Sequence, residues 1–255
     1  MKRIIYLLPV AALLMGMQSC CCDKDDDNDS APVAAPAIQP NGDFAVDLGL
    51  SVKWATCNVG ANTPEEYGDY YAWGDTTTYY EPGYAREDPQ THWKEGKSSG
   101  YDGSSYKYIN SSNNKLIKYC NKSSEGDGDY TDNDTTLLPV DDVAHYRWGG
   151  NWRMPTQAEF EELLDSCDYE YIRTDNNGYG MKFTSRKDPS QYIFLPGAGW
   201  RQGTTLHTST HTDYWSSSLD TNHPNQVWAL RFDRKNHYIV KNPRPYGLSV
   251  RPVCP

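Results

Sequence analysis

The stretch "NWRMPTQAEFEELLDSC", residues 151–167, carries the strongest secondary-structure signal of the sequence. Thr156 and Glu159 have the spacing of a capping box, in which each side chain accepts a hydrogen bond from the other residue's backbone N–H. The apolar residues that follow lie on one side of such a helix: Phe160, Leu163 and Leu164. We therefore predict a helix that begins after Thr156 and packs this side against a core.

The segments after this helix are short, and turn residues separate them. They are "YEYIRT", "NNGYG", "MKFTS", "YIFLP", "DYWSSS", "QVWALRF", "HYIVK" and "GLSVRPV". In "QVWALRF" the larger apolar residues alternate with the others, and we expect them to face the core: Trp228, Leu230 and Phe232. One or two helices with many short antiparallel strands predict an α+β domain.

Other patterns extend this domain toward the N-terminus. "FAVDLGLSVKWATCNVG", residues 44–60, alternates apolar and polar side chains, which predicts a half-buried strand. Residues 76–135 are rich in Gly, Ser, Asn, Asp and Tyr, so we expect a long insertion there. "LPVDDVAHYRWGG", residues 138–150, predicts a short helix that opens with Pro139. The sequence therefore predicts one domain over residues 44–255.

The start of the chain has the order of an export signal. A positively charged start and the apolar stretch "IIYLLPVAALLMGM", which is too short to span a bilayer, lead to Ser19 and three cysteines. This order predicts a signal peptide over residues 1–19 and lipidation of Cys20, whose acyl chains anchor the protein in a membrane. An ordinary secretory signal cleaved near Ser19 is the alternative. Residues 20–43 combine acidic residues with prolines and predict an extended tether.

The charge pattern indicates where the chain acts and what it does not bind. An acidic run directly after Cys20 resembles the surface-export signal of Bacteroidota lipoproteins, which implies an outer-membrane anchor with the domain facing the cell exterior. Without Lys2 and Arg3 the chain has 22 basic and 34 acidic side chains, a net charge of −12. Phosphate binding depends on Lys and Arg, so we expect no nucleic-acid partner. The 20 Tyr and 8 Trp residues favour a recognition surface.

Five motifs carry a family resemblance. In order they are "VDLGLSVKWATCNVGANTPEEYGDYYAWGDT", "WGGNWRMPTQAEFEELL", "FLPGAGWR", "YWSSS" and "YGLSVRPVC". Over residues 44–254 the chain resembles the Fibrobacter succinogenes major paralogous domain family. The resemblance implies a C-type-lectin-like fold, related to that of formylglycine-generating enzymes, in an exported or lipid-anchored chain. In that fold the first and last strands pair, which places "SVKWATC" beside "LSVRPVC".

Four cysteines lie within the domain. An even number in an exported chain permits two disulfides in three connectivities, and four buried thiols are the alternative. The strand pairing that the resemblance implies makes Cys57 and Cys254 one candidate pair and leaves Cys120 and Cys167 as the other.

The sequence contains no motif of a known catalytic site. G-x-S-x-G and H-E-x-x-H are absent, and "GAGWRQG" lacks the glycine spacing of a dinucleotide-binding loop. Formylglycine-generating enzymes rely on a reactive cysteine pair near the C-terminus, where this chain has only Cys254. Asp141 and Asp142 are better explained as acids of a first helical turn than as an acid–base pair. We therefore expect that the chain is not an enzyme.

Two segments contain residue types that bind metals. His207 and His211 are four residues apart, but "LHTSTHTDYW" is β-branched and polar, which favours a surface loop over a metal-binding helix. "DGDYTDND", residues 127–134, has carboxylates suited to Ca²⁺ but not the spacing of an EF-hand loop. We expect no metal or cofactor, with Ca²⁺ as the alternative.

The last third of the chain places adaptable hydrogen-bonding and aromatic side chains between its predicted core positions. Such residues are typical of binding surfaces, although ordinary polar turns are the alternative. The pattern also resembles the variable regions of diversity-generating retroelement targets. The predicted ligand-binding set is Asp213, Tyr214, Asp220, Asn222, His223, Asn225, Asn236, His237, Tyr238, Asn242, Arg244 and Tyr246.

These patterns together predict a surface lipoprotein that is held in the membrane by its lipid anchor. Its lectin-like domain is expected to bind a protein or glycan ligand on another cell. A surface enzyme acting on glycans or proteins is one alternative, and a structural or pilus-tip component without its own ligand is the other.

Overall fold

The computed structural model describes residues 45–79, 96–97, 100–174, 178–208 and 210–255. The predicted signal peptide, Cys20 and the whole of the tether lie outside these residues, as does part of the 76–135 insertion. Within the described ranges, no helix is long and apolar enough to cross a bilayer.

The predicted capping box is confirmed. The N-cap of α2 (Gln157–Ser166) is Thr156, whose hydroxyl accepts a hydrogen bond from the Glu159 N–H at 3.2 Å. The Glu159 carboxylate accepts one from the Thr156 N–H at 2.7 Å. Phe160 and Leu163 on the apolar side are fully buried. The local pattern was therefore sufficient to place this helix.

The second predicted helix is divided into two short pieces. Pro139 opens a 3₁₀ helix, η3 (Pro139–Asp141), and α1 (Val143–Trp148) follows it. Asp142 is the N-cap of α1, because its carboxylate accepts the N–H groups of two residues in the first turn. Two further 3₁₀ helices lie in the insertion: η1 (Ser123–Glu125) and η2 (Asp127–Asp129).

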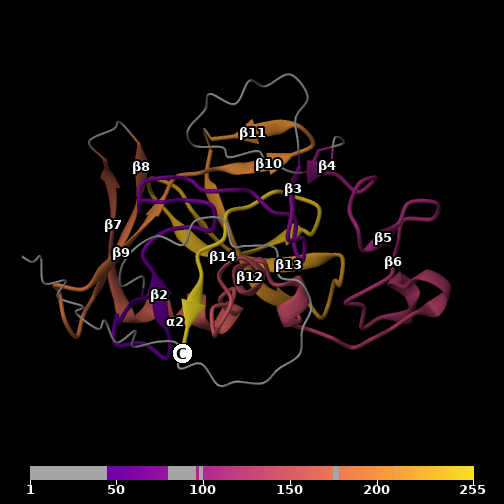
Figure 1. The fold of residues 1–255 in the computed structure, drawn as a ribbon, viewed down its shortest axis with the longest axis horizontal. Helices are drawn as coiled ribbons and strands as arrows, with labels where there is room; N and C mark the ends of the chain where they lie inside the picture. The colour runs from indigo at the N-terminus through magenta and orange to yellow at the C-terminus, as the bar shows by residue number, and fades with distance from the viewer. Residues whose placement is uncertain (1–44, 80–95, 98–99, 175–177, 209) are drawn as a thin grey trace, which may run out of the picture.

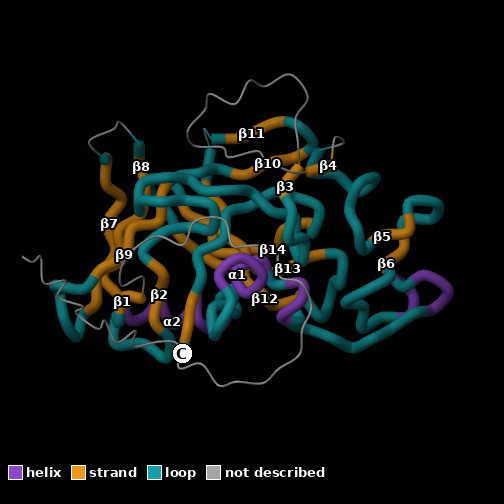
Figure 2. The backbone as a smooth tube through the Cα atoms, in the orientation of Figure 1, coloured by secondary structure: helices purple, strands orange, loops and turns teal. Residues whose placement is uncertain are grey.

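The remaining elements are short strands, so the class is α+β as predicted. Three sheets have three antiparallel strands each, in the orders β12-β13-β14, β7-β8-β9 and β1-β2-β15. Figure 1 shows the β12–β14 sheet at the centre, with the β7–β9 sheet to its left and β5 and β6 to its right. Turns and loops join these strands and make up much of the described chain (Figure 2).

The bounds of the strands follow the sheets. The central sheet has β12 (Thr212–Leu219), β13 (Gln226–Phe232) and β14 (His237–Pro243). The second has β7 (Cys167–Arg173), β8 (Tyr179–Ser185) and β9 (Tyr192–Pro196), and the third has β1 (Ala45–Val46), β2 (Lys53–Ala55) and β15 (Val253–Cys254). The two-stranded ladders are β3 (Thr78–Tyr79) with β4 (Gly96–Lys97), β5 (Ile109–Asn110) with β6 (Lys115–Leu116), and β10 (Trp200–Gln202) with β11 (Thr205–His207).

β13, the middle strand of the central sheet, packs against core clusters on both of its faces. Val227 and Ala229 of β13 belong to one core cluster, which includes Trp73 from the N-terminal part of the chain. Leu230 and Phe232 belong to a second cluster, which includes Phe160 of α2 and residues of the β7–β9 sheet. Both alternating sets of β13 therefore pack against apolar neighbours, and the strand has no solvent face.

Trp228 does not have the core position that its alternation predicted. It shares the face of Leu230 and Phe232 but is only half-buried. The Nζ atom of Lys241, its partner across β14, lies 4.5 Å from the centre of its ring. Trp228 is near the start of β13, where the covering core ends, so the prediction that it lies in the core is wrong.

The segments "SVKWATC" and "LSVRPVC" lie side by side as expected, through the pairing of β2 with β15. Val253 lies opposite Trp54 and Cys254 opposite Lys53. Cys57 follows β2, four residues beyond the partner of Cys254. All four cysteines of the domain are buried thiols, and no disulfide joins any of these described residues, so the structure has neither of the two candidate bridges.

The described part of the insertion belongs to the core rather than decorating it. Tyr101, Tyr106, Tyr108 and Tyr119 are all buried in the first core cluster. The guanidinium of Arg244 donates to the carbonyl oxygens that follow β6, at residues 118 and 119. Because Arg244 directly follows β14, these hydrogen bonds attach the insertion to the central sheet.

Candidate functional site

The twelve residues predicted to bind a ligand divide by exposure. The buried members are Asp213, Tyr214, Asp220, Asn242 and Arg244. His237 and Tyr246 are half-buried. The exposed members are Asn222, His223, Asn225, Asn236 and Tyr238. Only the exposed and half-buried residues are accessible to a partner without a change of fold.

The buried members Asp213, Tyr214 and Asn242 are bonded to neighbouring side chains or to the backbone. The Asp213 carboxylate accepts hydrogen bonds from Arg231 Nε and Nη2, each at 2.7 Å, and from Asn242 Nδ2 at 2.9 Å. Burial opposes its ionisation, but hydrogen bonds from Arg231 and His211 keep the pKa of Asp213 below its usual value. The Tyr214 hydroxyl donates to the Pro196 carbonyl oxygen at 2.8 Å. These side chains hold the sheet together and are not free to contact a ligand.

Asp220 fixes the turn between β12 and β13, which we call the 220–225 turn. Its carboxylate contacts the Asn222 N–H at 3.1 Å, His223 Nδ1 at 2.9 Å and Lys241 Nζ at 2.9 Å. Burial again opposes ionisation, while Lys241 and His223 keep the pKa of Asp220 low. The carboxylate therefore stays charged and holds the root of the turn.

The insertion holds the same turn from outside. Asn121 Nδ2 donates to the Thr221 carbonyl oxygen at 2.9 Å, and Lys122 Nζ donates to the Asn222 carbonyl oxygen. The side chains of Asn222, His223 and Asn225 remain exposed on this fixed backbone. These three form one exposed group of predicted ligand-binding residues on a backbone that contacts hold in place.

The other exposed residues lie at the opposite end of the central sheet. Asn236 and Tyr238 flank the start of β14, whose His237 pairs with the last residue of β13. His237 also packs on Tyr169, with ring centres 3.9 Å apart. Because β13 is seven residues long, the two groups are separated by about 20 Å. The exposed members of the predicted set therefore lie on two surfaces and not on one.

Tyr246 belongs to a third group, which is centred on Trp200. The ring centre of Trp200 lies 5.1 Å from Tyr246, 4.2 Å from His207 and 5.7 Å from His211, in stacked arrangements. His211 Nε2 lies 3.5 Å from Asp213. Both histidines therefore stack on an indole, and His207 ends a strand rather than lying on a helix.

The acidic segments of the insertion also have structural contacts. Asp127 accepts hydrogen bonds from the side-chain amides of Asn110 and Asn113, at 2.8 and 2.6 Å. Asp132 accepts one from the Cys120 N–H at 2.8 Å. Among the residues that the structure describes, no group of three or more His, Cys, Asp or Glu side chains is placed to hold a metal ion.

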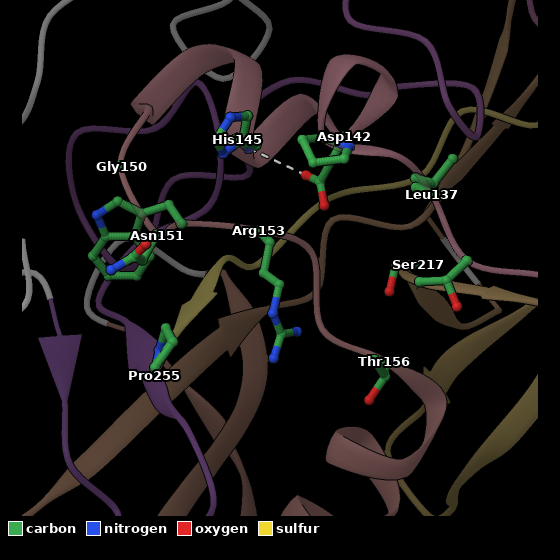
Figure 3. A pocket seen from close by; sticks show the side chains of 12 residues that line it. Leu137, Asp142, His145, Gly150, Asn151, Arg153, Thr156, Ser217 and Pro255 are labelled. Carbon is green, nitrogen blue, oxygen red and sulfur yellow. Dashed lines mark hydrogen bonds between the residues drawn. The ribbon is translucent and has the colours of Figure 1, made fainter. Parts of the chain in front are cut away.

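A cleft that sequence reasoning did not find lies between α1, the loop that follows it and the N-terminus of α2 (Figure 3). Its volume is about 380 Å³. Polar and apolar side chains both line it, among them Leu137, His145, Asn151, Trp152, Ser217 and Pro255. These residues come from four separate segments, so no local sequence motif could predict the cleft.

Comparisons with known proteins found no relative. No family model, curated protein or solved structure matches this chain. The family resemblance and its lectin-like fold therefore stay predictions from the sequence motifs.

Proposed function

We propose that this chain is a lipid-anchored protein of the outer cell surface that binds a ligand or partner cell. Its domain is of the C-type-lectin-like class implied by the major paralogous domain motifs. The proposal is supported by the order of charged start, apolar stretch, cysteine and acidic tether. It is also supported by the antiparallel pairing of β2 with β15, which closes the domain as that class requires.

The 220–225 turn is the observation that carries the binding proposal. Asp220 fixes it from within and Asn121 with Lys122 from outside, so its backbone is ordered before any partner arrives. Ordering a loop in advance removes part of the entropic cost of binding. The side chain of His223 is 62% exposed on this backbone, and its neighbours in the turn are amides that both donate and accept hydrogen bonds.

Replacing the three exposed side chains of the turn by alanine should weaken binding at least tenfold, because a few central side chains carry most of an interface's energy. The variant is Asn222→Ala with His223→Ala and Asn225→Ala. Thermal melts should stay close to those of the parent, since exposed substitutions usually change stability by less than about 0.5 kcal/mol. Binding is measured on whole partner cells and on a glycan array.

The other end of the same sheet supplies a matched control. Asn236→Ala with Tyr238→Ala removes exposed polar and aromatic groups about 20 Å away. This double variant should bind like the parent. If it loses binding while the turn variant retains it, the recognition surface lies at the β13–β14 end instead.

The anchor is tested independently of the ligand. Cys20→Ala should leave the chain unlipidated and released from the outer membrane, because the acyl chains supply the membrane affinity. Cys21→Ala is the matched control and should remain anchored. Cell fractionation and the intact mass of the mature chain measure both outcomes. Outer-membrane retention of the Cys20→Ala variant would contradict the lipid anchor.

A further inference from the structure

The cleft of Figure 3 contains charged side chains, but their charges are already satisfied. Arg153 makes a two-bond pair with Glu159, with Nη1–Oε2 and Nη2–Oε1 distances of 2.8 and 2.5 Å. Burial opposes ionisation of Glu159, while the hydrogen bonds from Arg153 keep its pKa below the usual value. The pair is therefore neutral as a unit, and an anion entering the cleft would have to compete with Glu159.

Asp142 also lines the cleft, and both oxygens of its carboxylate already accept hydrogen bonds. One carboxylate oxygen accepts the N–H groups of Ala144 and His145, at 2.9 and 3.2 Å. The second accepts the N–H of Met154 at 2.8 Å. Burial raises the pKa of Asp142, so its environment disfavours the charge that a cation would need. The cleft is thus poorly suited to an ion of either sign.

The polar side chains that remain in the lining are not part of an ion pair. Figure 3 shows His145 and Asn151 on one side of the cleft and Thr156 and Ser217 on the other. The two hydroxyls each have one partner already, since Thr156 accepts the Glu159 N–H and Ser217 Oγ donates to the Pro155 carbonyl oxygen at 3.3 Å. Their imidazole, amide and hydroxyl groups donate and accept hydrogen bonds. Apolar groups of Leu137, Pro139, Trp152 and Pro255 complete the lining. The Trp152 ring also contacts that of Trp148 edge to face, with ring centres 5.0 Å apart.

We infer that this cleft binds a small, neutral, hydroxyl-rich molecule of the class of uncharged sugars. Such a ligand offers alternating donors and acceptors to the polar side chains and C–H surfaces to the apolar wall. The volume of about 380 Å³ lies at the lower end of the range of small-molecule sites, which fits a short saccharide rather than a long one. The inference does not rest on the 220–225 turn, which contributes no residue to the lining.

The test follows the ring of Trp152 in the full chain labelled with 5-fluorotryptophan. The Trp152 signal in the ¹⁹F NMR spectrum is assigned by its loss in Trp152→Phe. Glucose, galactose, mannose and N-acetylglucosamine are titrated as neutral probes, and acetate and methylammonium as ionic ones. We expect a saturable shift of the Trp152 signal with at least one of the sugars and none with either ion.

The variants separate this site from the proposed recognition surface. Asn151→Ala, at an exposed position, should weaken the sugar response about fivefold, the usual worth of one hydrogen bond. His145→Ala removes a second hydrogen-bonding group from the cleft and should likewise weaken sugar binding. Asn222→Ala, in the 220–225 turn, should leave the sugar response unchanged. A saturable shift with an ion, no shift with any sugar, or parental affinity in both cleft variants would overturn the inference.

Discussion

Replacing Arg251 by methionine should lower the free energy of unfolding by about 3–5 kcal/mol. Arg251 is fully buried, and its Nη1 atom donates to the carbonyl oxygens of Ala55 and Thr56, both at 2.9 Å. Its Nη2 atom donates to the Phe194 carbonyl oxygen at 2.8 Å and its Nε atom to Asn58 Oδ1 at 2.9 Å. Methionine keeps the length of the side chain but leaves these buried acceptors without donors.

The effect should be large because one guanidinium joins three parts of the fold. Its acceptors lie at the end of β2, in the loop that follows and in β9, while Arg251 itself precedes β15. Burial lowers the pKa of Arg251, and neutral oxygen atoms compensate the charge. Lysine retains the charge but not the planar fork, so Arg251→Lys should recover little of the loss.

Chemical denaturation at neutral pH measures both variants against a surface control. Arg186 is half-exposed and pairs with Asp168 at 2.8 Å. Arg186→Met should cost less than about 1 kcal/mol, as surface pairs usually do. A free energy of unfolding for Arg251→Met within about 1 kcal/mol of the parent's would contradict the stabilising role of the guanidinium.

Asp141→Asn should cost about 2–4 kcal/mol and loosen the insertion first. The Asp141 carboxylate accepts a hydrogen bond from the Tyr119 hydroxyl at 2.6 Å and another from the Tyr108 hydroxyl. It also lies 2.5 Å from Lys118 Nζ and 3.4 Å from Lys107 Nζ. Asparagine keeps the shape but removes the charge that both lysines face. All four partners belong to the insertion, so hydrogen exchange should increase most over residues 100–135.

The stability that Asp141→Asn loses relative to the parent should decrease as the pH falls. Burial opposes ionisation of Asp141, but hydrogen bonds from Lys118, Tyr108 and Tyr119 keep its folded-state pKa below its usual value. The unfolded carboxyl has a pKa of about 3.9. The carboxylate therefore stabilises the fold fully above that value, and this contribution disappears as the pH falls toward the lower folded-state pKa. The difference between parent and Asp141→Asn should shrink accordingly in acid.

Urea titrations at neutral and acidic pH measure this difference. Asp168→Asn is the matched control, because the Asp168 side chain is 74% exposed and its pair with Arg186 lies on the surface. The control should cost less than about 1 kcal/mol. Equal losses at Asp141 and Asp168, or a loss at Asp141 that does not diminish in acid, would contradict the role given to the buried carboxylate.

The sequence alone determined the features that depend on near neighbours. The capping box of Thr156 and Glu159 and the apolar side of α2 follow from residues within one turn of helix, and the structure has both. The strand character of residues 226–232 likewise follows from alternation. The motifs at the two ends of the domain also led to the pairing of β2 with β15.

Only the tertiary structure decided which alternating positions are covered. Val227 and Ala229 are as deeply buried as Leu230, because segments far away in the sequence pack on the second face of the sheet. Trp228 is half-exposed since the covering core ends before it. The alternation within β13 does not indicate that distant segments cover its second face, nor that the core ends before Trp228.

The candidate site was decided in the same way. Asp213 and Asp220 resemble surface residues in the sequence, but the chain brings Arg231 to one and Lys241 to the other, which makes their burial tolerable. The exposed members of the predicted set lie at two ends of one strand, a separation set by sheet register. A polar residue's type gives its chemistry, whereas its partners, and hence its availability to a ligand, depend on residues that only folding brings near.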